Sequence, residues 1–200
     1  CFSRAGEVWC VGGNNNGNLG DGTTLSTDTA HRVPNLANVI GLDAGDAHVC
    51  ALKSTGQVVC WGRNANGQLG DSTTTPRSVP TVVPNLSQVQ QIVAGSHHTC
   101  AVRSDGHVLC WGYNAQGQLG NGNQSQTITP VLVPDFDGIV AGSAGHHTCV
   151  IDTQARVHCW GYNAFGAVGD STEGQVNEVR PSPVQLGLVG VTQIACGENH

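Results

Sequence analysis

Charge is scarce in this chain. Acidic and basic residues make up 11% of its 200 residues, against about 25% in an average protein, and the only lysine is Lys53. Positive charge clusters nowhere, and the net charge is −6. Because nucleic-acid binding draws its affinity from Lys and Arg placed beside phosphates, this composition argues against a nucleic-acid partner.

Long apolar runs and helical periodicity are also missing. No stretch approaches the roughly 18 apolar residues of a membrane span, and apolar residues do not recur at helical spacing. No signal-peptide pattern opens the chain, and it contains no methionine. We therefore expect an all-β protein with no membrane span in this chain, and we expect the sequence to come from a longer or processed product.

Residue groupings typical of catalysis are absent as well. There is no Gly-x-Ser-x-Gly elbow around a nucleophilic serine and no glycine-rich phosphate loop. Four Asn/Gly-rich loops lack the alternating acidic ligands of calcium sites and are interpreted as turns, at residues 14–23, 64–73, 114–122 and 163–172. We therefore predict no enzyme activity, no cofactor and no metal.

What the sequence does contain is one motif in four copies. The segment that starts at Cys100 with Cys-Ala-Val-Arg-Ser-Asp-Gly recurs from Cys50, from Cys149 and, with a shorter turn, from Cys1. A pair of small residues and then a histidine close each copy. The four copies form a single region, 1–200, with approximate boundaries at residues 1–49, 50–99, 100–148 and 149–200.

Each copy has the pattern of short β-strands. Apolar residues alternate on both sides of a turn, as at Cys100, Val102, Val108 and Cys110, and Gly106 stands where a tight hairpin needs a permissive backbone. A Pro-bounded apolar segment and a last apolar segment before the small-residue pair add two strands. Four short strands in a unit of about 50 residues are typical of a β-propeller blade, so the sequence predicts a propeller of four-stranded blades.

A tryptophan and a histidine recur at fixed positions of the motif. Tryptophans expected to pack between blades stand at Trp61, Trp111 and Trp160, whereas Val11 takes this place in the first copy. Aligned histidines stand at His48, His98, His147 and His200. They could form a ring of ligands in a propeller, but we expect each one to hydrogen-bond a turn of its own blade.

Eight of the nine cysteines fall into pairs. The pairs are Cys1/Cys10, Cys50/Cys60, Cys100/Cys110 and Cys149/Cys159. In each hairpin the two cysteines face one another on the same side, close enough for a disulfide. Four such bonds would indicate an oxidising compartment, because disulfides are rare in the cytosol.

Metal binding is the alternative for these cysteines. A His-x-Cys with a second Cys ten residues later, such as His48, Cys50 and Cys60, offers three ligands, but the two-to-four-residue Cys spacing of structural zinc sites is missing. The sequence favours disulfides. Cys196 replaces the alanine of the other copies and is expected to be a small buried thiol or to bond to another segment or subunit.

The repeated motif resembles the regulator of chromosome condensation repeat. Gly-x-His-x-Thr-Cys-Ala-Val followed by Gly-x-Val-x-Cys-Trp-Gly-x-Asn-x-x-Gly-Gln-Leu-Gly carries the resemblance, best seen in residues 95–120, and it covers essentially the whole chain. The family implies a β-propeller, commonly with seven blades, so four repeats would be part of such a propeller or a small ring. The cysteine-paired type resembled here implies a bacterial, exported protein.

These features together give three functional hypotheses. The first is a non-enzymatic recognition propeller that is extracellular, at the cell surface or periplasmic, and binds a protein through the segments that vary most between copies, residues 25–32, 74–81, 124–129 and 173–180. The second is a self-assembling structural subunit of an extracellular filament or surface appendage. The third, least favoured, is the guanine-nucleotide exchange activity that the family's eponymous member implies.

Overall fold

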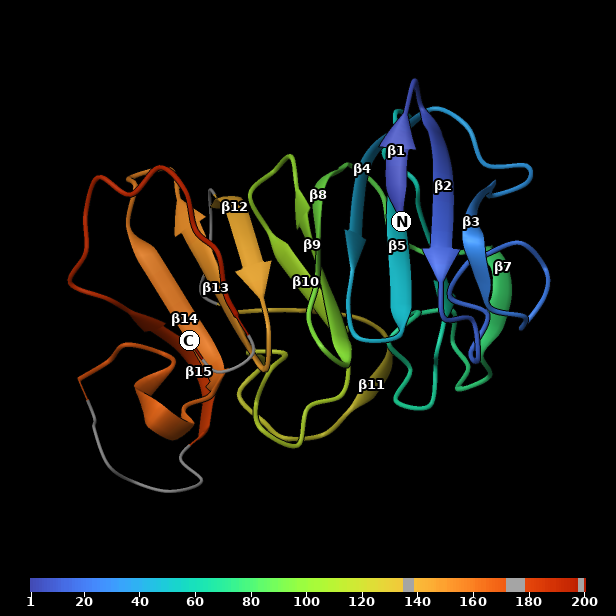
Figure 1. Cartoon of the computed structure of the whole chain (residues 1–200). Coiled ribbons are helices and arrows are strands. Elements are labelled where there is room, and N and C mark those ends of the chain that lie inside the picture. Colours follow the sequence, from blue (N-terminus) through green and yellow to red (C-terminus); the bar gives the residue numbers. More distant parts are fainter. Residues whose placement is uncertain (135–138, 172–178, 198–199) are drawn as a thin grey trace.

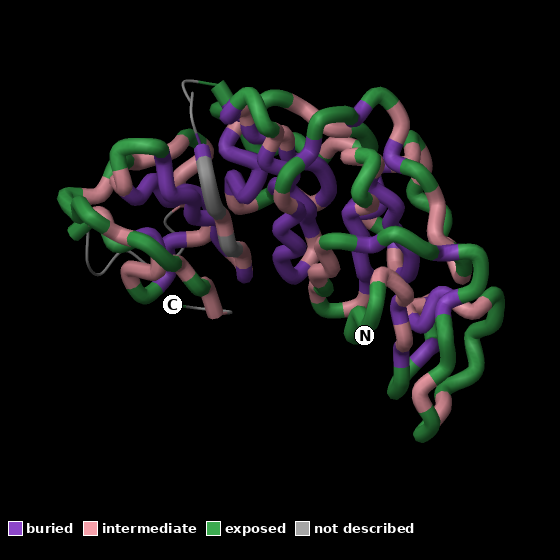
Figure 2. Tube along the Cα trace, turned by 90° about the horizontal axis from the view of Figure 1, so that it is seen from above, coloured by how far each residue is buried: buried purple, intermediate pink, exposed green. Residues whose placement is uncertain are grey.

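The structure, a computed structural model, describes residues 1–134, 139–171, 179–197 and 200. Short antiparallel strands follow one another along the chain and form four separate sheets, which lie side by side in an arc (Figures 1 and 2). The predicted all-β class is confirmed. The described part of the chain contains no helix with the length and hydropathy of a membrane span.

The sheets are built from strands that are consecutive in sequence. The first has three strands: β1 (Phe2–Arg4), β2 (Glu7–Gly12) and β3 (Thr27–Arg32). The second has β4 (Val39–Ala44), β5 (His48–Lys53), β6 (Val58–Gly62) and β7 (Arg77–Val82). The third has β8 (Val89–Ala94), β9 (His98–Arg103), β10 (Val108–Gly112) and β11 (Thr127–Leu132). The fourth has β12 (Ile139–Ala144), β13 (His147–Asp152), β14 (Val157–Tyr162) and β15 (Val179–Gln185), with a short 3₁₀ turn, η1 (Ala164–Gly166), after β14.

Three of the four sheets have the predicted four strands, and each begins one strand before the cysteine that opens the sequence motif. The second sheet, for example, starts with β4, which belongs to the end of the first sequence copy. Each sequence repeat therefore contributes its last strand to the following sheet. The four sheets form an open arc, with the first sheet at one end and the fourth sheet at the other (Figure 1).

The hairpin register brings each cysteine pair together. Cys50 lies directly opposite Cys60 and Cys100 opposite Cys110, with Cα atoms 4.1 Å apart in both pairs. All four predicted pairs form disulfides, the other two being Cys1–Cys10 and Cys149–Cys159. Each bond joins two neighbouring strands of one sheet, so the staple lies within a blade.

The apolar core lies between sheets rather than within one. Leu52 and Val58 of the second sheet, with Leu69 of the loop after β6, pack against Ala101 and Trp111 of the third. Equivalent clusters join the first sheet to the second and the third to the fourth. Val191, Ile194 and Cys196 cover the last sheet. A blade thus buries its face on its neighbour, as expected for stacked repeats that cannot fold alone.

The repetition of this contact comes from one tryptophan in each of three sheets. At Trp111 the pairing of β10 with β11 shifts register, and the indole Nε1–H donates to the Gln68 carbonyl of the preceding sheet at 2.9 Å. Gly70 lies under the ring with φ +68°, and a Cβ there would be 2.7 Å from Nε1. Trp61 and Trp160 repeat the arrangement, so the predicted inter-blade role of the tryptophans is confirmed.

Candidate functional site

The small-residue turns before each aligned histidine meet at one place. They line a hollow of about 320 Å³, whose walls include Gly45, Gly95, Gly145 and Gly197. The turns also bond to one another, because Ser96 N–H donates to the Gly145 carbonyl at 3.0 Å. This hollow has walls of small residues and backbone, and Asp46 is the one charged residue among those that line it.

Beside this hollow the histidines connect one sheet to the next. His48 Nε2 lies 2.9 Å from the hydroxyl of Thr99, and His98 Nε2 lies 2.7 Å from that of Thr148. The expectation that each histidine bonds a turn of its own blade was therefore wrong for these two side chains. The sequence of one repeat does not indicate which residues of the neighbouring blade lie beside it, so this contact could not be predicted from the repeat pattern.

The hydrogen-bond directions fix the tautomer of His48. The Thr99 hydroxyl donates its proton to the Gln68 carbonyl at 2.8 Å, so its oxygen accepts from His48 Nε2–H. Nδ1 is then unprotonated, and it is buried with no hydrogen-bond partner among the described residues. The same logic applies to His98, because Thr148 donates to the Gln118 carbonyl at 3.1 Å.

Burial keeps these imidazoles neutral. It lowers the pKa of His48 to about 4, with a smaller contribution from His97. Burial and the neighbouring histidines lower the pKa of His98 to about 3. Burial also lowers the pKa of His147 to about 4, assisted by His146. His200, the fourth aligned histidine, is exposed. His48 and His98 thus serve as neutral hydrogen-bonding links between blades.

The Asn/Gly-rich loops are organised by a neutral amide at their centre. Asn114 is fully buried; its Oδ1 accepts from Leu119 N–H at 2.9 Å, and its Nδ2 donates to the carbonyls of Asn123 and Ser125 at 3.0 Å each. Asn14 and Asn64 make the same set of bonds. The amide occupies the middle of each loop, which fits the interpretation of these segments as turns; residue 172, at the end of the fourth loop, lies outside the described residues.

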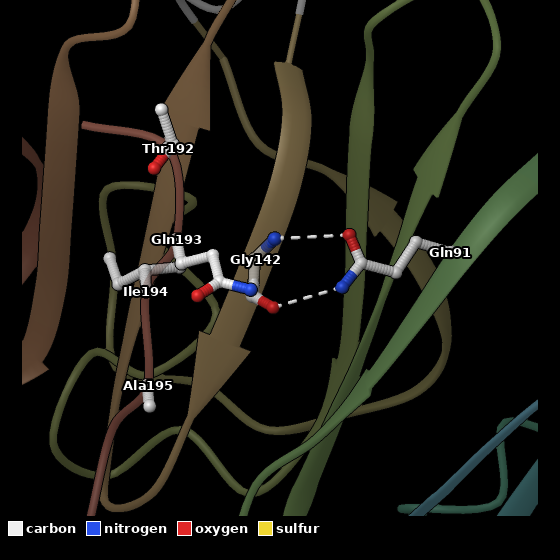
Figure 3. Close-up of a pocket in the computed structure, with 6 residues that line it drawn as sticks. All are labelled: Gln91, Gly142, Thr192, Gln193, Ile194 and Ala195. Atoms are coloured by element: carbon white, nitrogen blue, oxygen red, sulfur yellow. Dashed lines mark hydrogen bonds between the residues drawn. The ribbon is translucent and has the colours of Figure 1, made fainter. Parts of the chain in front are cut away.

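A glutamine provides another link between inner strands. The side chain of Gln91, on β8, accepts from Gly142 N–H at 3.1 Å and donates to the Gly142 carbonyl at 3.0 Å (Figure 3). It thereby copies the pairing of a β-strand across a blade boundary. A hollow of about 470 Å³ lies here, and Gln193, which occupies the place of Gln91 two copies later, also lines it.

One polar aromatic groove was not found from the sequence. His97 packs edge-on against Tyr113, with ring centroids 6.3 Å apart, and these residues line a hollow of about 190 Å³ with Gln116 and His146. The only indication in the sequence is that these positions differ between copies; Tyr113 replaces Arg63 of the previous repeat. Comparing the copies position by position would have pointed to it.

The segments predicted to vary most lie at the outer edge of the blades. Residues 25–32, 74–81 and 124–129 run into β3, β7 and β11, the outermost strands of their sheets. They expose apolar side chains, among them Leu25 at 76% and Val79 at 47%. Of residues 173–180, only 179 and 180 lie within the described part of the chain. The chain therefore carries a variable rim, which we define as the described residues of these segments.

Comparison with known proteins agrees with this architecture. The family model of the regulator of chromosome condensation (RCC1) repeat matches residues 5–52, 55–102, 105–151 and 154–200. A second model of the same repeat matches residues 39–68, 89–118 and 138–167. No curated protein sequence matches the chain significantly.

Solved structures share the fold at low identity. Human WBSCR16 superposes with a TM-score of 0.82 at 23% identity, over 98% of this chain and 54% of its own. Prp20p of Saccharomyces cerevisiae, described with its binding properties to Gsp1p and histones, gives 0.77 at 21%, over 90% of this chain and 46% of its own. Yeast RCC1 (Prp20) bound to Kap60 superposes with a TM-score of 0.73 at 24% identity, over 90% of this chain and 45% of its own. The chain spans about half the length of these proteins.

Proposed function

Because the chain belongs to the regulator of chromosome condensation (RCC1) repeat family, we propose that it is a recognition propeller that binds another protein through its variable rim and catalyses no reaction. The observation that carries this proposal is the contrast between the rim and the blade interior. The interior repeats the same Trp, Asn and His contacts from sheet to sheet. The rim differs between copies and exposes apolar side chains.

A protein is the partner class that this surface suits best. Exposed apolar groups within a weakly charged surface gain affinity by being removed from water, whereas a net charge of −6 with a single lysine offers little to a phosphate backbone. The binding of Gsp1p and histones belongs to Prp20p, whose 21% identity to this chain supports the fold alone. We do not extend the exchange activity to this chain.

A capture experiment tests the role of the rim. Immobilised chain is exposed to the extracellular fraction of its native source, and bound protein is quantified for the wild type and for the double variant Leu25→Ser, Val79→Ser. Loss of two apolar contacts of 1.5–3 kcal/mol each should reduce capture by about tenfold or more.

The matched control for this experiment is Ile40→Ser. Ile40 is 66% exposed on β4 and lies outside the rim, so this variant should capture partner as well as the wild type does. Equal capture by the rim variant and the wild type would show that the rim is not the binding surface. Loss of capture by Ile40→Ser would point to non-specific apolar adsorption.

We also propose that the protein is exported by a bacterium and resides outside the cytoplasm. Four disulfides within 200 residues support this location, because cytosolic reductants keep such thiols reduced. Peptide mapping of protein isolated from its native source, with thiols blocked at lysis, should recover all four bonds. Blocked thiols at these eight cysteines would overturn the proposal.

Self-assembly into a filament is the second candidate. The outermost strands support it, because β7 is paired on one side only and exposes Val79 and Val82, as an edge that another chain could extend. Sedimentation of the natural particle separates the two candidates. A discrete monomer at high concentration would contradict the filament.

A further inference from the structure

Cys196 lies beside the disulfide of the fourth blade. An imidazole nitrogen of His147, Sγ of Cys149 and Sγ of Cys196 all lie within 4.8 Å of one another. Cys149 and Cys159 are buried and bonded to each other, and Cys196, which lies outside the four disulfides, packs in the same apolar cluster. A third sulfur therefore lies close to an existing sulfur–sulfur bond.

The repeat explains why this arrangement occurs at the fourth blade. At the end of the inner strand β12, Ala144 packs against the apolar cluster that contains Cys100 and Cys110 of the preceding blade. Cys196 is the next copy of this position. The cysteine thus puts a thiol where the other copies have a methyl group.

His147 is a buried, neutral neighbour of these sulfur atoms. Its side chain is 1% exposed, and its Nδ1 has no hydrogen-bond partner among the described residues. Because burial lowers its pKa to about 4, the ring is neutral at ordinary pH. Thiolates attack disulfides and thiols do not, so the Cys196 thiol must lose its proton before it can react, and the neutral ring adds no positive charge that would lower the thiol pKa.

We propose that Cys196 and the Cys149–Cys159 disulfide form a thiol–disulfide exchange site. The Cys196 thiol loses its proton to the solvent, and its sulfur attacks Sγ of Cys149. The Cys149–Cys196 bond forms as the Cys149–Cys159 bond breaks, and the electron pair of the broken bond goes to Sγ of Cys159. Cys159 takes a proton from the solvent, so no oxidant or reductant is consumed.

The product has a different connection from the starting structure. Before exchange the bond joins β13 to β14 within the fourth blade; afterwards it joins β13 to the segment 191–196 that covers that blade. The exchange therefore replaces a disulfide within a blade by a disulfide between that blade and the next inner strand. Metal binding by the same three atoms is disfavoured in this state, because the Cys149 sulfur is already bonded to Cys159.

Thiol mapping of the folded wild-type chain tests the exchange directly. After incubation at pH 8 the protein is quenched with acid, denatured and labelled, and non-reduced peptides are analysed by mass spectrometry. We expect the label to divide between Cys196 and Cys159, with a peptide pair joined by Cys149–Cys196. Label on Cys196 alone, with Cys149–Cys159 intact, would overturn the proposal.

Two matched variants test the geometry independently. In Cys159→Ser, oxidised glutathione should produce the Cys149–Cys196 bond within the monomer. In Cys110→Ser, the partner of Cys100 is removed in the same way, but Ala144 faces it, so Cys100 should remain a thiol or carry glutathione. Failure of Cys159→Ser to form the new bond, or equal behaviour of the two variants, would also overturn the proposal.

Discussion

Replacement of Trp111 by alanine should lower the free energy of unfolding by about 3–5 kcal/mol. The indole is fully buried between the second and third sheets, where it packs with Leu52, Val58 and Leu69. Its removal leaves a cavity that the neighbouring blades cannot close, because each is held in shape by its own disulfide. Chemical denaturation under non-reducing conditions measures the loss.

A second variant separates packing from hydrogen bonding. Trp111→Phe removes the indole N–H but fills most of the space, and the Gln68 carbonyl keeps the Thr99 hydroxyl as a donor. The cost should therefore be about 1–2 kcal/mol. Phe165→Ala, at a ring that is 88% exposed, should change stability by no more than about 0.5 kcal/mol. An effect of Trp111→Ala as small as that of Phe165→Ala would refute the inter-blade role.

The parts of the fold that depend on strand alternation were predictable from the sequence. Cys100 and Cys110 lie on opposite sides of a short turn, so the period of two residues places both on one face and directly opposite each other. The same reasoning gave the hairpins and the four-stranded unit. This reasoning depends only on local backbone geometry, and the four copies of the motif support it independently.

Contacts between blades were predictable in kind but not in detail. A large buried ring such as Trp111 had to pack against a neighbouring repeat, whereas the acceptor of its N–H, the Gln68 carbonyl, is a backbone atom that any residue could supply. The partner of His48 was missed for a related reason. Thr99 precedes a cysteine in its own copy and looks like an ordinary strand residue until two sheets are placed side by side.

The surface features were the least predictable. The variability of residues 74–81 indicated an exposed segment, but its position on an outermost strand follows from the order of β7 in the sheet. The proximity of Cys196 to Cys149 depends on how one inner strand covers the preceding blade. Both facts concern the arrangement of whole sheets, which the spacing within a motif does not encode.

Stability should fall steeply between pH 6.5 and pH 4. The buried histidines have pKa values of about 4, 3 and 4 in the folded chain, at His48, His98 and His147, and about 6.5 when unfolded. The unfolded chain therefore binds more protons in this interval. The stability that neutral burial provides is complete above pH 6.5 and is lost as the pH falls toward the folded values. By pH 5 each of these three histidines should lower the free energy of unfolding by about 2 kcal/mol.

The carboxyl groups with shifted pKa values do not produce this pH dependence. Hydrogen bonds lower the pKa of Asp21 and Asp71 below 3.8 despite their partial desolvation, so their contribution is lost only at lower pH. Burial raises the pKa of Asp43, which accepts from Ala94 N–H. A raised carboxyl pKa favours the folded state as the pH falls, so Asp43 opposes the histidines. The loss near pH 5 is therefore specific to imidazole.

Denaturation curves at pH 7, 6 and 5 measure this effect, and one variant assigns it. His98→Gln removes the most strongly shifted histidine, so its stability should vary less between pH 7 and pH 5, by about 2 kcal/mol, even if the variant is less stable at pH 7. His31→Asn, at an exposed position on β3, should keep the wild-type pH dependence. If His98→Gln retains the full slope, protonation of these buried links is not what weakens the contact between blades.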